Sequence, residues 1–225
     1  QWTLLLPALA WAGCVLWLAP LPLAARITAI FLHALGTLLP PLVRPGRWQG
    51  LIVPMILFAA VLAWFFTRAP SNERDWQADV AALARAEFNG DTVTIHGVRH
   101  CDYRTETDYA CRWESRTYTL ADLQTVDLFV ITWGAPGIAH TIASFGFGEA
   151  GYVCFSIETR KEKGEGYSAV KGFFRQYEKI YVVADEQDVI RLRTNVRREK
   201  VYLYPLKVRP ALARSIFLDY LRELN

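Results

Sequence analysis

The sequence predicts N-terminal transmembrane helices followed by an α+β domain, and charge distribution and periodicity are the two observations behind that prediction. Residues 1–67 contain three arginines and no acidic residue, whereas residues 68–225 contain 22 basic and 22 acidic residues. In the second part, short runs of β-forming residues are interspersed with segments of helical period. We therefore divide the chain into a transmembrane part, residues 1–68, and an exported α+β domain, residues 69–225.

The overall composition excludes several classes of protein. The 225 residues carry 25 Lys and Arg against 22 Asp and Glu, a formal charge of +3. This near balance provides no bulk attraction to phosphates, so we expect no nucleic-acid partner. An almost uncharged third excludes a purely cytosolic enzyme, and a highly charged two-thirds excludes a polytopic transporter. The chain begins with Gln1 and its last helical pattern still runs at Asn225, so we expect further residues at both ends.

Three apolar stretches are candidates for membrane spans. A bilayer core of about 30 Å needs roughly 20 mostly apolar residues in a helix. The segments 2–23, 27–43 and 51–67 approach this length and contain no charged residue. A signal peptide followed by a buried hairpin is the alternative, but the basic start and short apolar core of a signal peptide are missing. We expect three spans, with two as the alternative.

The orientation of the spans follows from the positive-inside rule. Arg44 and Arg47 lie in the loop before the last span, whereas Arg26 and Arg68 lie on the other side. Loops rich in Lys and Arg remain in the cytoplasm. The last span then leads outward, and residues 69–225 lie outside the cytoplasm.

The exported domain reads as an antiparallel sheet with helices packed on one side. An Asn89-Gly90 turn precedes the first expected strand, and a Gly-rich turn at 148–151 joins two strands into a hairpin. The expected strands are 91–96, 126–133, 138–147, 152–159, 180–184 and 201–206, with a possible short strand at 189–193. The expected helices are 75–86, 167–177 and 210–224.

Two cysteines in a polar stretch predict a disulfide. Cys101 and Cys111 are ten residues apart in a segment that would face an oxidising compartment. A zinc site with His96 and His100 is the alternative, but it needs closer Cys and His spacing than this chain offers. We expect no metal and no cofactor.

His140 is the first candidate for catalysis. It lies on the expected strand 138–147, behind the Gly- and Pro-rich loop 134–137, and Ser144 shares its face. A histidine at the mouth of a strand beside small residues can act as a general base toward a nucleophile. A buried, hydrogen-bonded histidine without catalytic function is the alternative.

The neighbouring strand 152–159 contributes polar residues that alternate with apolar ones. Ser156 or Glu158 would orient the imidazole of His140 as a third catalytic member, and the hairpin register decides between them. Cys154 is a candidate nucleophile. However, it lies between apolar residues without a helix N-terminus to lower its pKa, which favours an inert buried thiol.

The polar segment after this strand suggests a substrate-binding network. Arg160, Glu165, Tyr167 and Arg175 are candidates, because arginines bind phosphate or carboxylate head groups through paired hydrogen bonds. A solvated loop without such a function is the alternative.

Several segments together resemble one known family. The segments are TETDY at 105–109, VDLF at 126–129, IAHT at 138–141, FSIETRK at 155–161, GEGYS at 164–168, GFFRQY at 172–177 and IRLRTN at 190–195. They look like the exported domain of the Lnb-type lipoprotein N-acyltransferase family. The resemblance extends over about residues 70–225.

The resemblance implies a fold related to the papain-like and NlpC/P60 hydrolases in permuted order, in which the histidine strand precedes the helix of the nucleophilic cysteine. His140 matches the family's catalytic histidine. The family's nucleophile lies in an Asn-Cys-Thr segment after the helix that ends here at Asn225, so we expect a truncated C-terminus. Cys154 stands where relatives often carry a small apolar residue, which again indicates that its side chain packs in the core and is not the nucleophile.

The activity implied by the resemblance is lipoprotein N-acylation. A thiolate activated by His140 would take an acyl chain from a membrane phospholipid and pass it to the N-terminal amine of a diacylglyceryl-cysteine lipoprotein. Phospholipids and bacterial lipoproteins are the expected partners, and the inner membrane with its periplasmic side is the expected location. Trp133, Phe173 and Phe174 are candidates for lining an acyl groove. A cell-wall peptidase or amidase of the NlpC/P60 type, or a non-catalytic membrane-anchored module that binds lipid or lipoprotein, are the alternatives.

Overall fold

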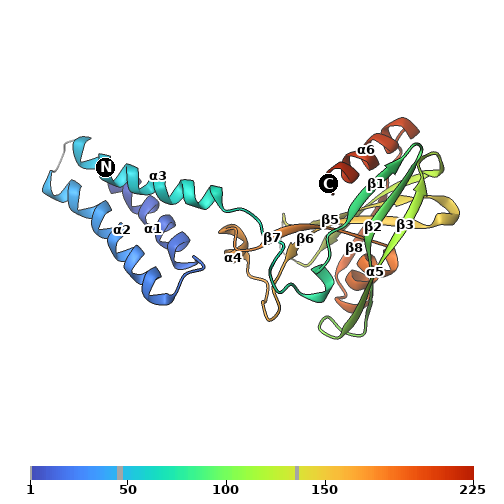
Figure 1. Cartoon of the computed structure of the whole chain (residues 1–225), viewed down its shortest axis with the longest axis horizontal. Coiled ribbons are helices and arrows are strands. Elements are labelled where there is room, and N and C mark those ends of the chain that lie inside the picture. The colour runs from blue at the N-terminus through green and yellow to red at the C-terminus, as the bar shows by residue number, and fades with distance from the viewer. Residues whose placement is uncertain (1, 45–47, 135–136) are drawn as a thin grey trace. The chain divides into compact units, whose positions relative to one another are not determined.

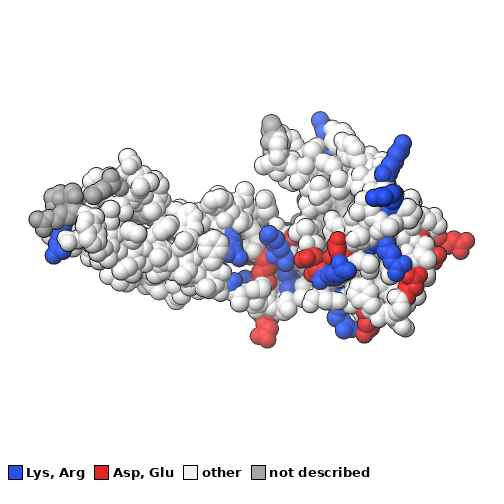
Figure 2. Space-filling view, turned by 90° about the horizontal axis from the view of Figure 1, so that it is seen from above, with Lys and Arg blue, Asp and Glu red and all other residues white. Residues whose placement is uncertain are grey.

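The computed structural model describes residues 2–44, 48–134 and 137–225, and these form two compact units. The helical unit comprises Gln1–Glu73 and Gly166–Tyr177, and the sheet unit comprises Arg74–Glu165 and Glu178–Asn225. Charged side chains gather over the sheet unit, whereas the surface of the apolar helices is almost free of them (Figure 2). The helical unit thus includes one segment, 166–177, that the sequence assigned to the exported domain.

The helical unit contains three long apolar helices (Figure 1). They are α1 (Trp2–Trp17), α2 (Leu23–Val43) and α3 (Ile52–Thr67), the last preceded by a short 3₁₀ helix, η1 (Trp48–Leu51). Among the described residues, two helical stretches are long and apolar enough to cross a membrane: α2, and η1 with α3. The first expected span is shorter than predicted, because α1 has 16 residues and Leu23 already begins α2.

Small residues let these helices approach closely. A Cβ atom at Gly36 would lie only 2.5 Å from Cδ1 of Leu57, so α2 and α3 touch at this point. The ring of Trp11 in α1 packs edge-to-face against Phe58 and Phe65 of α3. Arg47, one of the two arginines in the predicted cytoplasmic loop, lies outside the described residues.

The sheet unit is built on a mixed sheet with eight strands in the described part of the chain. Their order is β1-β2-β7-β6-β5-β4-β8, with β3 paired to β2. All pairs are antiparallel except β2 and β7, which run parallel. The strands are β1 (Arg85–Asn89), β2 (Thr92–Tyr103), β3 (Tyr109–Thr119), β4 (Thr125–Thr132), β5 (His140–Gly146), β6 (Tyr152–Arg160), β7 (Glu178–Ala184) and β8 (Lys200–Pro205).

Short helices connect these strands. The sheet unit contains η2 (Ala78–Val80), η3 (Leu120–Asp122), η4 (Gly148–Ala150), α5 (Glu186–Arg191), the π-helical η5 (Leu192–Val196) and α6 (Pro210–Arg222). The helix α4 (Ala169–Phe173) belongs to the helical unit. The expected helix 210–224 is confirmed as α6, which begins at Pro210 as the sequence predicts.

The expected strands are confirmed as the start of β2 and as β4 to β8, but the expectations for segments 75–86 and 189–193 are wrong. Segment 75–86 is a 3₁₀ turn followed by β1, because Ala86 pairs with Ile95 across the Asn89-Gly90 turn. Segment 189–193 is helical. Asp185 accepts a hydrogen bond from the backbone N–H of Asp188 at 2.9 Å and thereby caps the start of α5.

Helices cover both faces of the sheet, which corrects the prediction of helices on one side only. On one face, Phe217 of α6 packs with Phe145 and Phe155. On the other face, Val189 of α5 shares a cluster with Cys154. Successive residues of a strand point to opposite faces, and β5 and β6 carry buried residues at both parities. Both faces therefore need a cover.

Candidate active site

His140 is the first residue of β5 and pairs with Ile131 of β4. The loop before it contains Gly134 and Gly137, both with positive φ, whereas Ala135 and Pro136 of the same loop lie outside the described residues. The side chain of His140 is 17% exposed. The imidazole is therefore half-buried at the beginning of its strand, and a small part of it reaches the surface.

The imidazole of His140 is joined to two polar side chains of β6. Its Nε2 lies 2.8 Å from Oγ of Ser156, and Ser156 donates a hydrogen bond of 2.7 Å to Oε1 of Glu158. Nε2 also lies 3.3 Å from the same carboxylate oxygen. The hairpin register, in which Ile142 pairs with Ser156, places both β6 residues on the face of His140. The register therefore brings both Ser156 and Glu158 to the imidazole, so the choice between them that the sequence left open does not arise.

This hydrogen-bond chain assigns the tautomer of the neutral imidazole. Ser156 has one hydroxyl proton, which it donates to the carboxylate of Glu158. Its oxygen must then accept from Nε2 of His140, so Nε2 carries the ring proton. The lone pair is left on Nδ1, which makes no hydrogen bond within the described part of the chain. Nδ1 is thus the ring nitrogen that can take a proton from a reactant.

Arg193 binds the same carboxylate oxygen of Glu158 that the histidine approaches. Its Nη2 donates to Oε1 of Glu158 at 2.9 Å, and its Nη1 lies 3.3 Å from Oε2 of Glu199. Arg193 is buried in the π-helical segment Leu192–Val196, and single π-helical turns recur at functional sites. The sequence placed Arg193 in a matching segment but did not predict this contact, since 35 residues separate the two partners.

Burial alone would raise the pKa of Glu158. The hydrogen bond with His140 and the positive charge of Arg193 outweigh that effect and hold the pKa well below its ordinary value. Glu158 is therefore ionised at neutral pH. A fixed carboxylate in this position stabilises the positive charge that His140 acquires when Nδ1 accepts a proton.

Arg160 and Glu165 make other contacts. The guanidinium of buried Arg160 donates from Nε to the carbonyl of Val80 at 3.0 Å and stacks 4.2 Å from the ring centroid of Trp76. Glu165 accepts a hydrogen bond of 3.1 Å from the backbone N–H of Glu162. Both side chains stabilise the polypeptide around them. Their substrate-binding role stays a prediction, which these contacts do not favour.

Tyr167 and Arg175 belong to the helical unit. The ring of Tyr167 is 69% exposed and stacks on Tyr177. Arg175 is exposed and has a positive φ of 53°, and its guanidinium lies over the rings of Phe65 and Phe66. Within the sheet unit, the predicted residues that come together are thus His140, Ser156 and Glu158.

Cys154 is fully buried in β6 and pairs with Ser144 of β5 and Ala184 of β7. Burial raises the pKa of its thiol far above the ordinary value. A thiol that stays protonated is a poor nucleophile. The described residues contain one other free cysteine, Cys14 of the helical unit.

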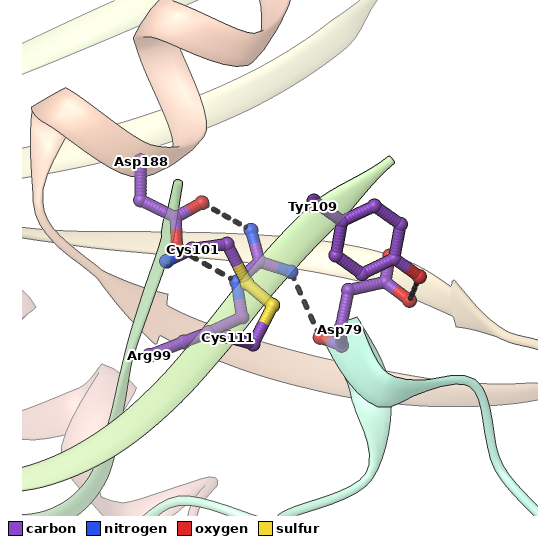
Figure 3. Close-up of a disulfide and its surroundings, with 6 residues drawn as sticks. All are labelled: Asp79, Arg99, Cys101, Tyr109, Cys111 and Asp188. Carbon is purple, nitrogen blue, oxygen red and sulfur yellow. Dashed lines mark hydrogen bonds and ion pairs between the residues drawn. A yellow bond between two sulfur atoms is a disulfide. The ribbon is translucent and has the colours of Figure 1, made fainter. Parts of the chain in front are cut away.

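The predicted disulfide is confirmed, and it lies beside a buried ion pair (Figure 3). Cys101 and Cys111 pair directly across β2 and β3. Asp188 of α5 accepts a 2.7 Å hydrogen bond from the backbone N–H of Cys101 and binds Arg99 through both carboxylate oxygens, at 2.6 and 3.0 Å. These contacts hold α5 on the sheet, five residues before Arg193. No group of three or more potential metal ligands occurs in residues 2–44, 48–134 and 137–225.

A comparison with known proteins relates this site to one family. The family model described as the Lnb N-terminal periplasmic domain matches residues 109–225, which includes the whole hydrogen-bond chain from His140 to Arg193. No curated protein and no solved structure matches the chain, so the permuted papain-like relationship stays a prediction. The match and the two long apolar helices fit a membrane-anchored protein with a periplasmic domain. Because the match extends over more than half of the sequence, the chain belongs to the Lnb family.

Proposed function

We propose that this protein is a lipoprotein N-acyltransferase. It moves an acyl chain from a membrane phospholipid to the N-terminal amine of a diacylglyceryl-cysteine lipoprotein at the periplasmic side of the bacterial inner membrane. The observation that carries the proposal is the chain of contacts from His140 through Ser156 and Glu158 to Arg193, inside the part that matches the Lnb family.

In the first half of the reaction, Nδ1 of His140 accepts the proton of a cysteine thiol. The thiolate attacks the ester carbonyl of a phospholipid and forms a thioester. The leaving oxygen takes the proton back from the imidazolium, which releases a lysophospholipid. From the resemblance we expect the thiol in an Asn-Cys-Thr segment after residue 225, and in this proposal that cysteine is the nucleophile.

In the second half, the amine of the lipoprotein attacks the thioester carbonyl. An amide bond forms, the carbon–sulfur bond breaks, and Nδ1 of His140 takes the proton that the amine loses. The ionised Glu158 stabilises the imidazolium in both halves, and a positioned general base of this kind contributes a factor of about 10²–10⁴ in rate.

Attachment to the membrane suits this chemistry. Both expected substrates reside in the same leaflet, and a domain tethered to that surface meets them at a high effective concentration. The two helical stretches long enough to cross a membrane would provide the tether.

The test uses the full-length gene product in phospholipid vesicles with a diacylglyceryl lipoprotein as acceptor. We expect His140→Ala to abolish the mass gain of the lipoprotein while the protein remains folded. His100→Ala is the matched control, since His100 is a partly exposed histidine that hydrogen-bonds Asp185 at 3.1 Å, and it should keep activity. Normal turnover by His140→Ala rejects the proposal, and cleavage of cell-wall peptides without acyl transfer replaces it with the peptidase alternative.

A further inference from the structure

Most of the connection between β6 and β7 belongs to the helical unit instead of the sheet unit. This part, Gly166–Tyr177, is called the 166–177 segment below, and it contains the short helix α4. It carries two basic residues, Lys171 and Arg175, and no acidic residue. Its contacts within the helical unit locate it relative to the apolar helices.

The 166–177 segment packs against the C-terminal end of α3. Phe174 is 8% exposed and shares a cluster with Val61 and Phe65. The guanidinium carbon of Arg175 lies 5.5 Å from the ring centroid of Phe65 and 5.4 Å from that of Phe66. The helix α3 ends one residue after Phe66, at Thr67. The 166–177 segment therefore lies where α3 ends.

The length and the end residues of α3 fit a helix that ends at a membrane boundary. The continuous helical stretch Trp48–Thr67 has 20 residues, about 30 Å at 1.5 Å per residue, which matches a bilayer core. At the same end, the guanidinium of Arg68 lies 5.4 Å from the ring centroid of Trp64. Aromatic and basic side chains gather at membrane–water interfaces. In a membrane-spanning α3, the segment that touches this end would lie at the interface.

The other side of the 166–177 segment exposes large apolar side chains. Tyr167 is 69% exposed, Val170 61% and Phe173 71%, at intervals of three residues. Adjacent exposed apolar side chains with basic residues between them are typical of surfaces that contact lipid. In water these three side chains would lose the free energy that burial provides.

We propose that the 166–177 segment is a membrane-contact surface whose occupant is the bilayer interface itself. Val170 and Phe173 insert among the lipids, and Tyr167, Lys171 and Arg175 lie at the level of anionic headgroups. The bilayer is the occupant because the segment packs against an apolar helix end and its charged residues are all basic. This inference rests on the membrane span of α3 and not on acyl transfer.

The contact gives the sheet unit a second attachment to the membrane. One attachment is the chain that leaves α3 at Thr67, and the other is the 166–177 segment, which begins six residues after the end of β6, the strand of Ser156 and Glu158.

The experiment measures the depth of spin labels in the full chain, reconstituted into vesicles that contain phosphatidylglycerol. Cysteine replaces Val170 or Phe173, one at a time, and carries a nitroxide. In the background every other free cysteine is replaced by alanine: Cys14, Cys154 and the cysteine expected after residue 225. Phe88→Cys on β1 is the matched control, because Phe88 is an exposed phenylalanine of the sheet unit, 47% exposed. We expect the ratio of collisions with oxygen to collisions with a water-soluble nickel chelate to be about fivefold higher at 170 and 173 than at 88.

Each other outcome overturns the proposal. A ratio equal to that of the Phe88 site at both positions shows that the segment faces water, and shielding from both reagents shows that protein covers it. Labelling two positions separately guards against a local disturbance by one substitution. Collisions are measured without turnover. If the segment inserts but the parent protein transfers no acyl chain, the proposed function is disproved and the membrane contact is not.

Discussion

His140, Ser156, Glu158 and Arg193 act as one polar unit in the sheet unit. Its hydrogen bonds have definite directions: Nε2 of His140 donates to Ser156, Ser156 donates to Glu158, and Arg193 also donates to Glu158. Satisfied networks of this kind are rigid, because any rearrangement leaves a buried polar group without a partner. The orientation of Nδ1 is therefore a property of the whole unit.

Arg193→Met is expected to destabilise the protein by about 3 kcal/mol, since it leaves two carboxylates without their buried cation. The pKa of Glu158 is lower in the folded than in the unfolded protein. Glu158 therefore contributes its full stabilisation at pH values above its unfolded-state pKa, about 4.3, and this stabilisation is lost as the pH falls through the folded-state pKa. In Arg193→Met the folded-state pKa of Glu158 rises. The stabilisation by Glu158 is then smaller, and on acidification it is lost at a higher pH than in the parent protein.

Urea denaturation at a series of pH values measures both effects. Arg191→Met is the control, because Arg191 is exposed and its ion pair with Asp102 is exposed as well; such pairs contribute less than about 1 kcal/mol. Equal effects of the two substitutions at every pH would contradict the role of Arg193.

Cys154→Ala is expected to leave acyl transfer close to normal. The thiol is buried, and burial raises its pKa, so the folded protein should react with iodoacetamide at pH 8 far more slowly than the unfolded chain. Mass spectrometry of alkylated peptides measures the rate. A folded but inactive Cys154→Ala protein would show that the thiol takes part in the reaction.

At the scale of elements, α5 and the π-helical segment η5 connect two regions of the sheet unit. Asp188 fastens α5 to Arg99 and to the backbone of Cys101 on β2 (Figure 3). Arg193, in η5, reaches Glu158 on β6. The same short helical stretch thus covers one face of the sheet and supplies the cation of the candidate site.

The disulfide between β2 and β3 is expected to stabilise the sheet unit. It closes a loop with a sequence separation of 10 residues, for which loop-closure entropy predicts about 2–3 kcal/mol. Replacing Cys101 and Cys111 together by serine should lower the free energy of unfolding by this amount. Denaturation of the variant beside the oxidised and reduced parent measures it, and unchanged stability would contradict the expectation.

At the scale of the whole molecule, the chain combines an apolar helical unit with a charged sheet unit. The predicted topology leaves the loop at Arg44 in the cytoplasm and the sheet unit outside. In a background where Cys14, Cys154 and the cysteine expected after residue 225 are replaced by alanine, a cysteine at position 72 should react with a membrane-impermeant maleimide that reaches the periplasm. A cysteine at position 49 should react only after the inner membrane is permeabilised. The reverse pattern would invert the topology.

The sequence by itself determined the features that depend on local composition and alternation. The division between apolar and charged parts, the hairpin of β5 and β6, the disulfide and the helix at Pro210 were all predictable, because each depends on residues close together in the chain. His140 became a candidate through its strand position and the family resemblance, which the match to residues 109–225 supports.

Tertiary structure decided the features that depend on distant partners. Segment 75–86 has a helical period, yet pairing with β2 makes its end a strand. Arg160 looks available in the sequence, but the carbonyl of Val80 and the ring of Trp76 bury its charge. Arg193 joins Glu158 only because α5 folds back over β6. The physical reason is common to all three: the free energy of pairing or burying a group depends on neighbours that only the folded chain brings together.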